Sequence, residues 1–221
     1  MTTIFESRLF ARWLHIICAS LLFAAVFASS LMTRNASANA ATMKRELTTS
    51  ASSIDSYWEG EFGDLGFTYS TPGLQFESGE FKSDCEGESQ FAAYCGLDET
   101  IYLDPAAIDD VAAEYGNILP SVLLAHEWGH HLTFLFASYG GNDVDLDWLD
   151  KDWEIEVLAD CLSGVYIGNL WYTFQTEEGD LTSAIDFMSL IGDPTHGSGD
   201  DRIVAFMHGF VDGLNGCDVL S

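Results

Sequence analysis

The sequence is poor in positive charge. It has 8 lysine and arginine residues against 35 aspartate and glutamate residues, and its formal net charge is −27 at pH 7. A surface with this balance repels the phosphates of nucleic acids and the headgroups of anionic lipids. The composition therefore argues against nucleic acids as partners of the folded protein.

The sequence also lacks any pair of cysteines with CxxC spacing, which zinc sites made of four cysteines usually need. Of the five cysteines, Cys18 lies in the N-terminal segment, and Cys85, Cys95, Cys161 and Cys217 remain. An even number in an exported chain indicates two disulfides, for which three pairings exist. The short interval between the first two favours Cys85–Cys95 together with Cys161–Cys217.

A glycine is missing from the one stretch that looks like a calcium loop. Asp143, Asp145, Asp147 and Glu154 follow the spacing of EF-hand positions 1, 3, 5 and 12, but Trp148 stands where the loop requires glycine. This excludes an EF-hand. A looser calcium site stays open, although most acidic loops are simply hydrated.

Residues 1–40 have the features of an export signal. Arg8 and Arg12 precede an apolar run over residues 13–28, and small residues follow up to Ala40. This order predicts a secretory signal cleaved after Ala40 and a mature domain over residues 41–221, located outside the cytoplasm as a secreted or periplasmic protein. The alternative is an uncleaved anchor that tethers the domain to a membrane and faces outside. His15 within the run disfavours it.

The mature domain is expected to have a real core, since 48% of the chain is hydrophobic and 13% aromatic. No internal repeat is present. Residues 41–51 are polar and small, which predicts a flexible start. The patterns predict an α+β fold that is mainly helical, with a small sheet near its N-terminal third. The expected strands are Phe67–Tyr69, Leu74–Phe76 and Thr100–Leu103, and the expected helices are 54–62, 105–115, 120–137, 153–171, 180–191 and one after an N-cap at Ser198.

The segment His126-Glu127-Trp128-Gly129-His130 is an HExxH motif inside the apolar helix predicted for residues 120–137. Residues four apart share one helix face, so the two imidazoles can hold one Zn²⁺. Glu127 stands beside them, within reach of a water molecule on the metal. Unpaired polar side chains would be costly on a helix this apolar, which favours a metal site over a solvated face.

The segment Glu156-Val-Leu-Ala-Asp160 supplies two more carboxylates on one face of the next helix. One can be the third zinc ligand, and the other can accept a hydrogen bond from a ligand histidine and fix its tautomer. Solvation of the helix face is the simpler alternative, but the apolar residues around Glu156 and Asp160 disfavour it.

With these motifs the chain resembles the neutral zinc metallopeptidases, a family with a zincin-like fold. The matching segments are residues 94–104, 125–131, 156–164, and 195–198 followed by Arg202. The resemblance implies His126, His130 and Glu156 as zinc ligands, Glu127 as catalytic base and Asp160 as a carboxylate that supports a ligand. It departs from the family at Leu132-Thr133, where Val-Gln is usual, and in the length and acidity of the segment before Glu156, which leaves substrate specificity open.

These residues predict a zinc metalloendopeptidase that hydrolyses peptide bonds of peptide or protein substrates through a zinc-activated water. The alternative is an exported zinc-binding protein without catalysis, acting in binding or assembly on the same scaffold. Glu127 argues against it, because a structural site is normally closed by four ligands.

Three further histidines are expected to have different roles. His131 points about 100° away from its neighbour His130 and is expected to be structural. His208 is expected at the surface or in packing. His196, in a glycine-rich turn, is expected either to stabilise the oxyanion of the reaction or to act as a turn residue, and the sequence does not decide between these roles.

Overall fold

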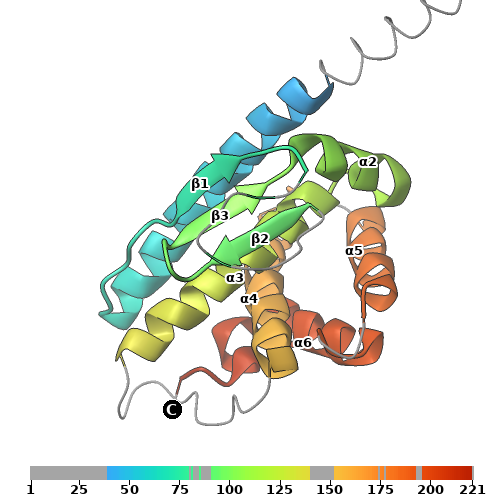
Figure 1. Ribbon diagram of the computed structural model, residues 1–221. Coiled ribbons are helices and arrows are strands. Elements are labelled where there is room, and N and C mark those ends of the chain that lie inside the picture. Colours follow the sequence, from blue (N-terminus) through green and yellow to red (C-terminus); the bar gives the residue numbers. More distant parts are fainter. Residues whose placement is uncertain are drawn as a thin grey trace, which may run out of the picture. The chain divides into compact units, whose positions relative to one another are not determined.

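A computed structural model describes residues 39–79, 81, 85, 91–139, 152–173, 175–176, 178–192 and 196–220. The chain divides into two compact units, residues 1–41 and residues 42–221, and the fold described below is that of the second (Figure 1). Residues 1–38 of the expected export signal and most of the acidic loop before Glu156 lie outside the described residues. The signal and its cleavage therefore stay predictions, and the question of a loose calcium site stays open.

Residues 42–65 form one helix. The predicted helix over residues 54–62 is its C-terminal part, but the prediction of a flexible start at residues 41–51 is wrong. The reason is an apolar face with helical spacing that continues to the N-terminal side of Ile54. Along the whole helix this face is made of Met43, Leu47, Ala51, Ile54, Trp58 and Phe62, which are all buried.

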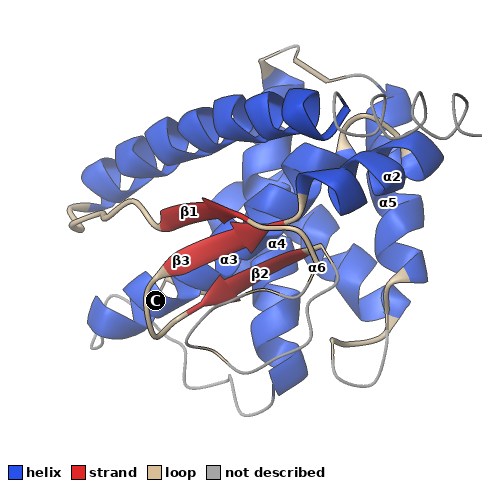
Figure 2. Cartoon of the chain, turned by 45° about the horizontal axis from the view of Figure 1, so that its top comes forward, coloured by secondary structure: helices blue, strands red, loops and turns tan. Residues whose placement is uncertain are grey.

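The sheet has three short strands, β1 (Gly73–Phe76), β2 (Ala92–Cys95) and β3 (Thr100–Leu103), in the order β1-β3-β2. β1 runs parallel to β3, and β2 runs antiparallel to it with Tyr94 opposite Ile101 (Figure 2). All four residues of β3 are buried, as expected for a central strand. β1 and β3 confirm two predicted strands, whereas β2 was not predicted.

The predicted strand at Phe67–Tyr69 is wrong, because α3 binds this segment through side chains instead of a backbone ladder. Phe67 stacks on Tyr139. The Tyr139 hydroxyl donates to the Thr68 carbonyl oxygen, and the Trp128 indole N–H donates to the Tyr69 hydroxyl, with a nitrogen–oxygen distance of 2.9 Å. The bond to the Thr68 carbonyl satisfies a backbone group that a strand would pair with a neighbour, and the bond to the Tyr69 hydroxyl holds the segment on α3.

The helices that follow confirm the predicted ones within a few residues. They are α2 (Pro105–Tyr115), α3 (Leu119–Tyr139), α4 (Asp152–Tyr172), α5 (Glu178–Leu190) and α6 (Gly199–Asp212), followed by the 3₁₀ helix η1 (Gly213–Cys217). Asp104 caps α2 by accepting hydrogen bonds from two backbone N–H groups. Ser198 caps α6, as predicted, and forms a capping box with Asp201.

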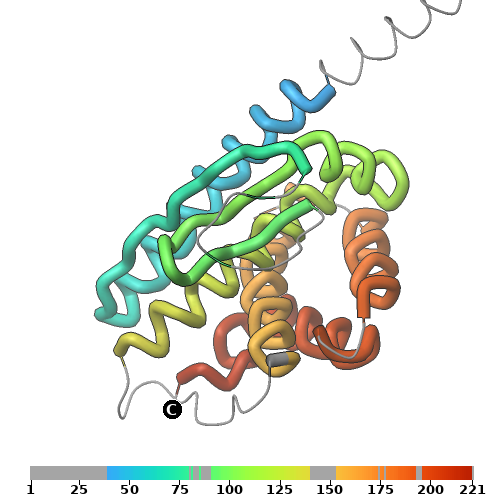
Figure 3. Tube along the Cα trace, viewed as in Figure 1, coloured from blue at the N-terminus to red at the C-terminus, as the bar shows by residue number. Residues whose placement is uncertain are grey.

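Helix α4 is packed between α3 and α6, although α6 follows it in the chain only after α5 (Figure 3). The approach of α6 is very close at Gly209, where a Cβ atom would stand 1.9 Å from the carbonyl oxygen of Cys161. Only glycine permits this separation. α4 and α6 therefore meet backbone to backbone next to the site described below.

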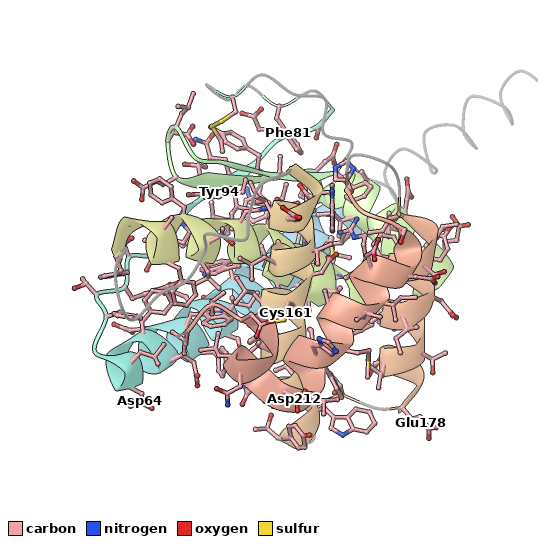
Figure 4. The ribbon with its side chains drawn as sticks, turned by 90° about the horizontal axis from the view of Figure 1, so that it is seen from below. Asp64, Phe81, Tyr94, Cys161, Glu178 and Asp212 are labelled. Atoms are coloured by element: carbon pink, nitrogen blue, oxygen red, sulfur yellow. A yellow bond between two sulfur atoms is a disulfide. The ribbon has the colours of Figure 1, made fainter. Side chains whose placement is uncertain are left out.

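Both expected disulfides are present, Cys85–Cys95 at the edge strand β2 and Cys161–Cys217 between α4 and η1 (Figure 4). The structure thus confirms the pairing that the short interval favoured.

Among the described helices, none combines the length and the apolar composition needed to cross a membrane.

Candidate metal centre

The motif His126–His130 lies in the middle of α3, one of the most apolar parts of the chain. Fifteen of its 21 residues are buried. Gly129, inside the motif, lies so close to α4 that an added Cβ would stand 2.7 Å from the carbonyl oxygen of Ala159. This contact places the histidines of α3 directly beside the carboxylates of α4. The sequence offered one clue to it, a glycine in the interior of a helix.

Three side chains converge where the helices cross. The Glu156 Oε2 atom lies 3.2 Å from the Nε2 atom of His126 and 3.6 Å from that of His130. The two Nε2 atoms are 3.2 Å apart. These residues form the one group of at least three potential ligands that the described part of the chain contains.

The triangle has the size that zinc requires. Zinc bonds to histidine nitrogen and carboxylate oxygen of about 2.0–2.2 Å, at tetrahedral angles, place neighbouring ligand atoms about 3.3 Å apart. The three observed separations of 3.2, 3.2 and 3.6 Å bracket this value. The donor set of two imidazoles and one carboxylate is also one that Zn²⁺ prefers. His126, His130 and Glu156 therefore fit the ion that the motif predicts.

Asp160 holds the outer nitrogen of His126. Its Oδ1 atom lies 2.8 Å from His126 Nδ1, and the carboxylate is completely buried. Because Asp160 accepts at Nδ1, the proton of a neutral His126 is placed there, and Nε2 keeps its lone pair directed at Glu156 and His130. The structure thus puts Asp160 where the sequence predicted a supporting carboxylate.

Arg202 of α6 belongs to the site, although the sequence analysis assigned it no role. Its Nε atom donates to Asp160 Oδ2 at 2.6 Å and its Nη2 atom donates to Oδ1 at 2.8 Å, a bidentate pair. Arg202 is 4% exposed. The family resemblance singled out the position of Arg202, but a separation of 42 residues from Asp160 gave no sign of this pairing.

The charges of the site are mutually stabilised. Burial by itself raises the pKa of Asp160, but the neighbouring His126 and Arg202 lower it by more, so the pKa lies below its ordinary value. Burial likewise raises the pKa of Glu156, and hydrogen bonds from His126 and His130 outweigh it and lower the pKa. Both carboxylates are therefore anionic at neutral pH, as ligation and histidine orientation require.

His126 shows the opposite balance. Burial lowers its pKa, but the charge and hydrogen bond of Asp160 and the hydrogen bond of Glu156 raise it overall. Without a metal, His126 therefore binds a proton strongly. A metal ion at Nε2 has to displace that proton, which makes metal affinity dependent on pH.

Glu127 follows His126 on α3 and is buried. It is 7% exposed. Among the residues that the structure describes, no hydrogen bond or ion pair to its side chain is found. A carboxylate in this situation is costly unless it meets water or a ligand.

His131 is structural, as its direction on the helix predicted. It is fully buried. One ring nitrogen, Nε2, lies 2.7 Å from the carbonyl oxygen of Ser70, which can only accept, so Nε2 carries the proton. The other, Nδ1, then accepts from the Tyr94 hydroxyl at 3.1 Å. His131 in this way ties α3 to β2 and to the segment after the first helix.

His196 and His208 are both exposed. The glycine that follows His196 is packed on α4, since a Cβ at Gly197 would lie 3.2 Å from a methyl group of Val157 and 3.9 Å from Cγ of Arg202. The turn with His196 therefore lies beside the helix that carries Glu156. His208 lies on the outer side of α6, where packing or the surface was expected.

Comparisons with known proteins agree with this geometry. A model of the family described as "Putative neutral zinc metallopeptidase" matches residues 25–220. Two Escherichia coli proteins, both named "Uncharacterized protein YpfJ" and found in strains K12 and O6:H1, are 27% identical over 184 residues. The match covers 71% of this chain and 63% of each relative, so the chain spans less than two thirds of their length. No solved structure gives a significant match. The chain belongs to the putative neutral zinc metallopeptidase family.

Proposed function

We propose that the protein is an exported zinc metalloendopeptidase that hydrolyses peptide bonds, with zinc held by His126, His130 and Glu156 and with Glu127 as the catalytic base. The observation that carries the proposal is the triangle of nitrogen and oxygen atoms at 3.2, 3.2 and 3.6 Å, beside a buried glutamate that has no hydrogen-bond partner among the described residues.

Three protein ligands favour catalysis over a purely structural role. A structural zinc site is normally closed by four side chains, whereas a catalytic site keeps one position for water or substrate. Within the described residues no fourth histidine, cysteine or carboxylate joins the group. The alternative of a non-catalytic zinc-binding protein has no comparable observation in its favour.

Zinc, when bound, would act as a Lewis acid and lower the pKa of a water molecule that it coordinates. Glu127 takes the proton of the attacking water and returns it to the leaving amine, so that one carboxylate serves both halves of the hydrolysis. It stands one residue after His126, and no described residue bonds its carboxylate, so it is available for this transfer.

Asp160 and Arg202 keep the ligands ready for the metal. Asp160 fixes the Nδ1–H tautomer of His126, and Arg202 neutralises the buried charge of Asp160 through two hydrogen bonds. The pair itself carries no net charge. His196 is proposed to donate a hydrogen bond to the oxyanion that forms at the substrate carbonyl, because its turn packs against α4 next to Glu156.

Export is proposed from the N-terminal signal and is supported by the two disulfides, which persist in oxidising compartments. The substrates are proposed to be peptides or proteins, as the family description implies. Their sequence preference is open.

The test is cleavage of an unbiased peptide library by the purified protein, combined with metal analysis. We expect about one zinc ion per chain, cleavage that a chelator stops, and recovery when zinc is added back. The His126→Ala, Glu156→Ala double variant serves as the control and should contain no zinc. Stoichiometric zinc in that variant would place the metal elsewhere, and cleavage unaffected by the chelator would refute a metallopeptidase.

A further inference from the structure

The residue after Asp160 is a disulfide cysteine. Cys161 of α4 is bonded to Cys217 of η1, and the two residues are 3% and 4% exposed. The bond therefore starts one position away from the carboxylate that holds His126. It ends in the segment that continues directly from α6, the helix that carries Arg202.

Helix α6 is thus attached to α4 at two places. At its N-terminal end Arg202 forms the bidentate pair with Asp160, and at its C-terminal end the chain is bonded covalently to Cys161. Between them Gly209 lets the helix backbone rest on the carbonyl of Cys161. The noncovalent attachment, between Arg202 and Asp160, is the one that the metal centre needs, because it pairs the buried charge of Asp160 with a cation.

The second disulfide offers a natural comparison. Cys95, which is bonded to Cys85, follows Tyr94, and the Tyr94 hydroxyl donates to His131. His131 is not one of the three converging residues. Each disulfide is adjacent in sequence to a residue that bonds a histidine of α3, but only Cys161–Cys217 adjoins the partner of a proposed ligand.

We propose that the Cys161–Cys217 disulfide is a positioning element of the metal centre, so that the site reaches its full zinc affinity only after this bond has formed. The inference rests on the proposed zinc site. In the oxidation the two thiols give up two protons and two electrons to a disulfide oxidant, which leaves as a dithiol. The bond then holds α6 on α4, Arg202 stays on Asp160, and Asp160 keeps His126 oriented for zinc.

The first experiment compares two disulfide variants by zinc competition with a chromogenic chelator. Cys161→Ser with Cys217→Ser should weaken zinc binding about tenfold or more, the range found when an outer partner of a ligand is lost. Cys85→Ser with Cys95→Ser should change it by less than about threefold. Equal zinc affinity of the first variant and the wild type would overturn the proposal, whereas a wild type that binds no zinc would refute the proposed function itself.

A double-variant comparison separates positioning from general loosening of the fold. In an Asp160→Asn background, the changes Cys161→Ser and Cys217→Ser should weaken zinc binding by less than about a further twofold. The reason is that the side chain through which the disulfide acts has already been changed. A loss as large as in the wild-type background would show that the disulfide does not act through Asp160.

Because loss of a buried disulfide can prevent folding, a second measurement starts from folded protein. The Cys85→Ser, Cys95→Ser variant, loaded with zinc, retains only Cys161–Cys217. A phosphine reductant is added with excess chelator, and free thiols and released zinc are followed together. Zinc should leave as the two thiols appear. Zinc that stays bound after both thiols have formed would overturn the proposal.

Discussion

Gly129 of α3 and Ala159 of α4 are in backbone contact, and a Cβ atom on Gly129 would stand 2.8 Å from the Cα atom of Ala159. This contact sets the distance between the helix with the two histidines and the helix with Glu156. Gly129, the residue directly before the motif's second histidine, therefore decides whether the three side chains can meet.

Gly129→Ala is expected to push α4 away from α3. The overpacking should lower the free energy of unfolding by about 1–3 kcal/mol and weaken zinc binding at the same time. Thermal unfolding of the metal-free protein and chelator competition measure the two effects. Gly60→Ala is the matched control, since nothing lies within 4 Å of a Cβ at Gly60, and it should leave zinc affinity unchanged. Wild-type affinity in Gly129→Ala would contradict the role of the contact.

Glu156→Gln is expected to damage zinc binding more than Asp160→Asn. The first change removes an anionic ligand atom, whereas the second weakens only the orientation of His126, for which about 10- to 100-fold is typical. Competition with a chromogenic chelator gives both affinities under one set of conditions. If Asp160→Asn proved the more harmful change, the roles of the two carboxylates would be reversed.

Arg202→Met is expected to be strongly destabilising, because it leaves Asp160 buried without its cation. Breaking a buried ion pair in this way costs about 3–5 kcal/mol. Arg202→Lys keeps the charge but loses the bidentate geometry, so it should lower the free energy of unfolding by less than Arg202→Met. Urea unfolding of both variants tests this. If Arg202→Met lowered the free energy of unfolding no more than a substitution at an exposed position does, the Arg202–Asp160 pair would contribute little to stability.

His131 should make the metal-free protein less stable in mild acid. Burial lowers the pKa of its imidazole, and hydrogen bonding to Ser70 only partly offsets this. The folded state therefore binds the proton less readily than the unfolded chain. The stability that His131 contributes is present above about pH 6.5, the ordinary histidine pKa, and is lost as pH falls below it.

The measurement is the free energy of unfolding at pH 7.5 and pH 5 in the presence of a chelator, for the wild type and for His131→Gln. The decrease between the two pH values should be smaller in the variant. An identical decrease would mean that His131 does not titrate differently in the two states. His208→Gln, a change at an exposed position, is the control.

The parts of the site that lie within one helix could be predicted from the sequence. Spacing of four places His126 and His130 on one face of α3 and Glu156 and Asp160 on one face of α4. Ser198 and its acidic first turn likewise marked the start of α6. Such patterns are local, so the helix period alone is enough to interpret them.

The parts that join different helices could not be predicted. The pair Arg202–Asp160 spans 42 residues, and the contact between Gly129 and Ala159 depends on how two helices pack. Strand β2 was missed because its residues, Ala92–Cys95, do not alternate between polar and apolar. The prediction of a flexible segment at residues 41–51 fails because the apolar residues there are sparse among serines and threonines, although their spacing is helical.

The most direct test of the account is Glu127→Gln. Glu127 is close to the ligands but is not one of the three converging side chains, so the amide should leave zinc binding intact. Proton transfer, however, needs the carboxylate. We expect the variant to bind about one zinc ion with wild-type affinity and to cleave peptides at least about 100-fold more slowly. Cleavage at the wild-type rate by the zinc-loaded variant would contradict the proposed mechanism.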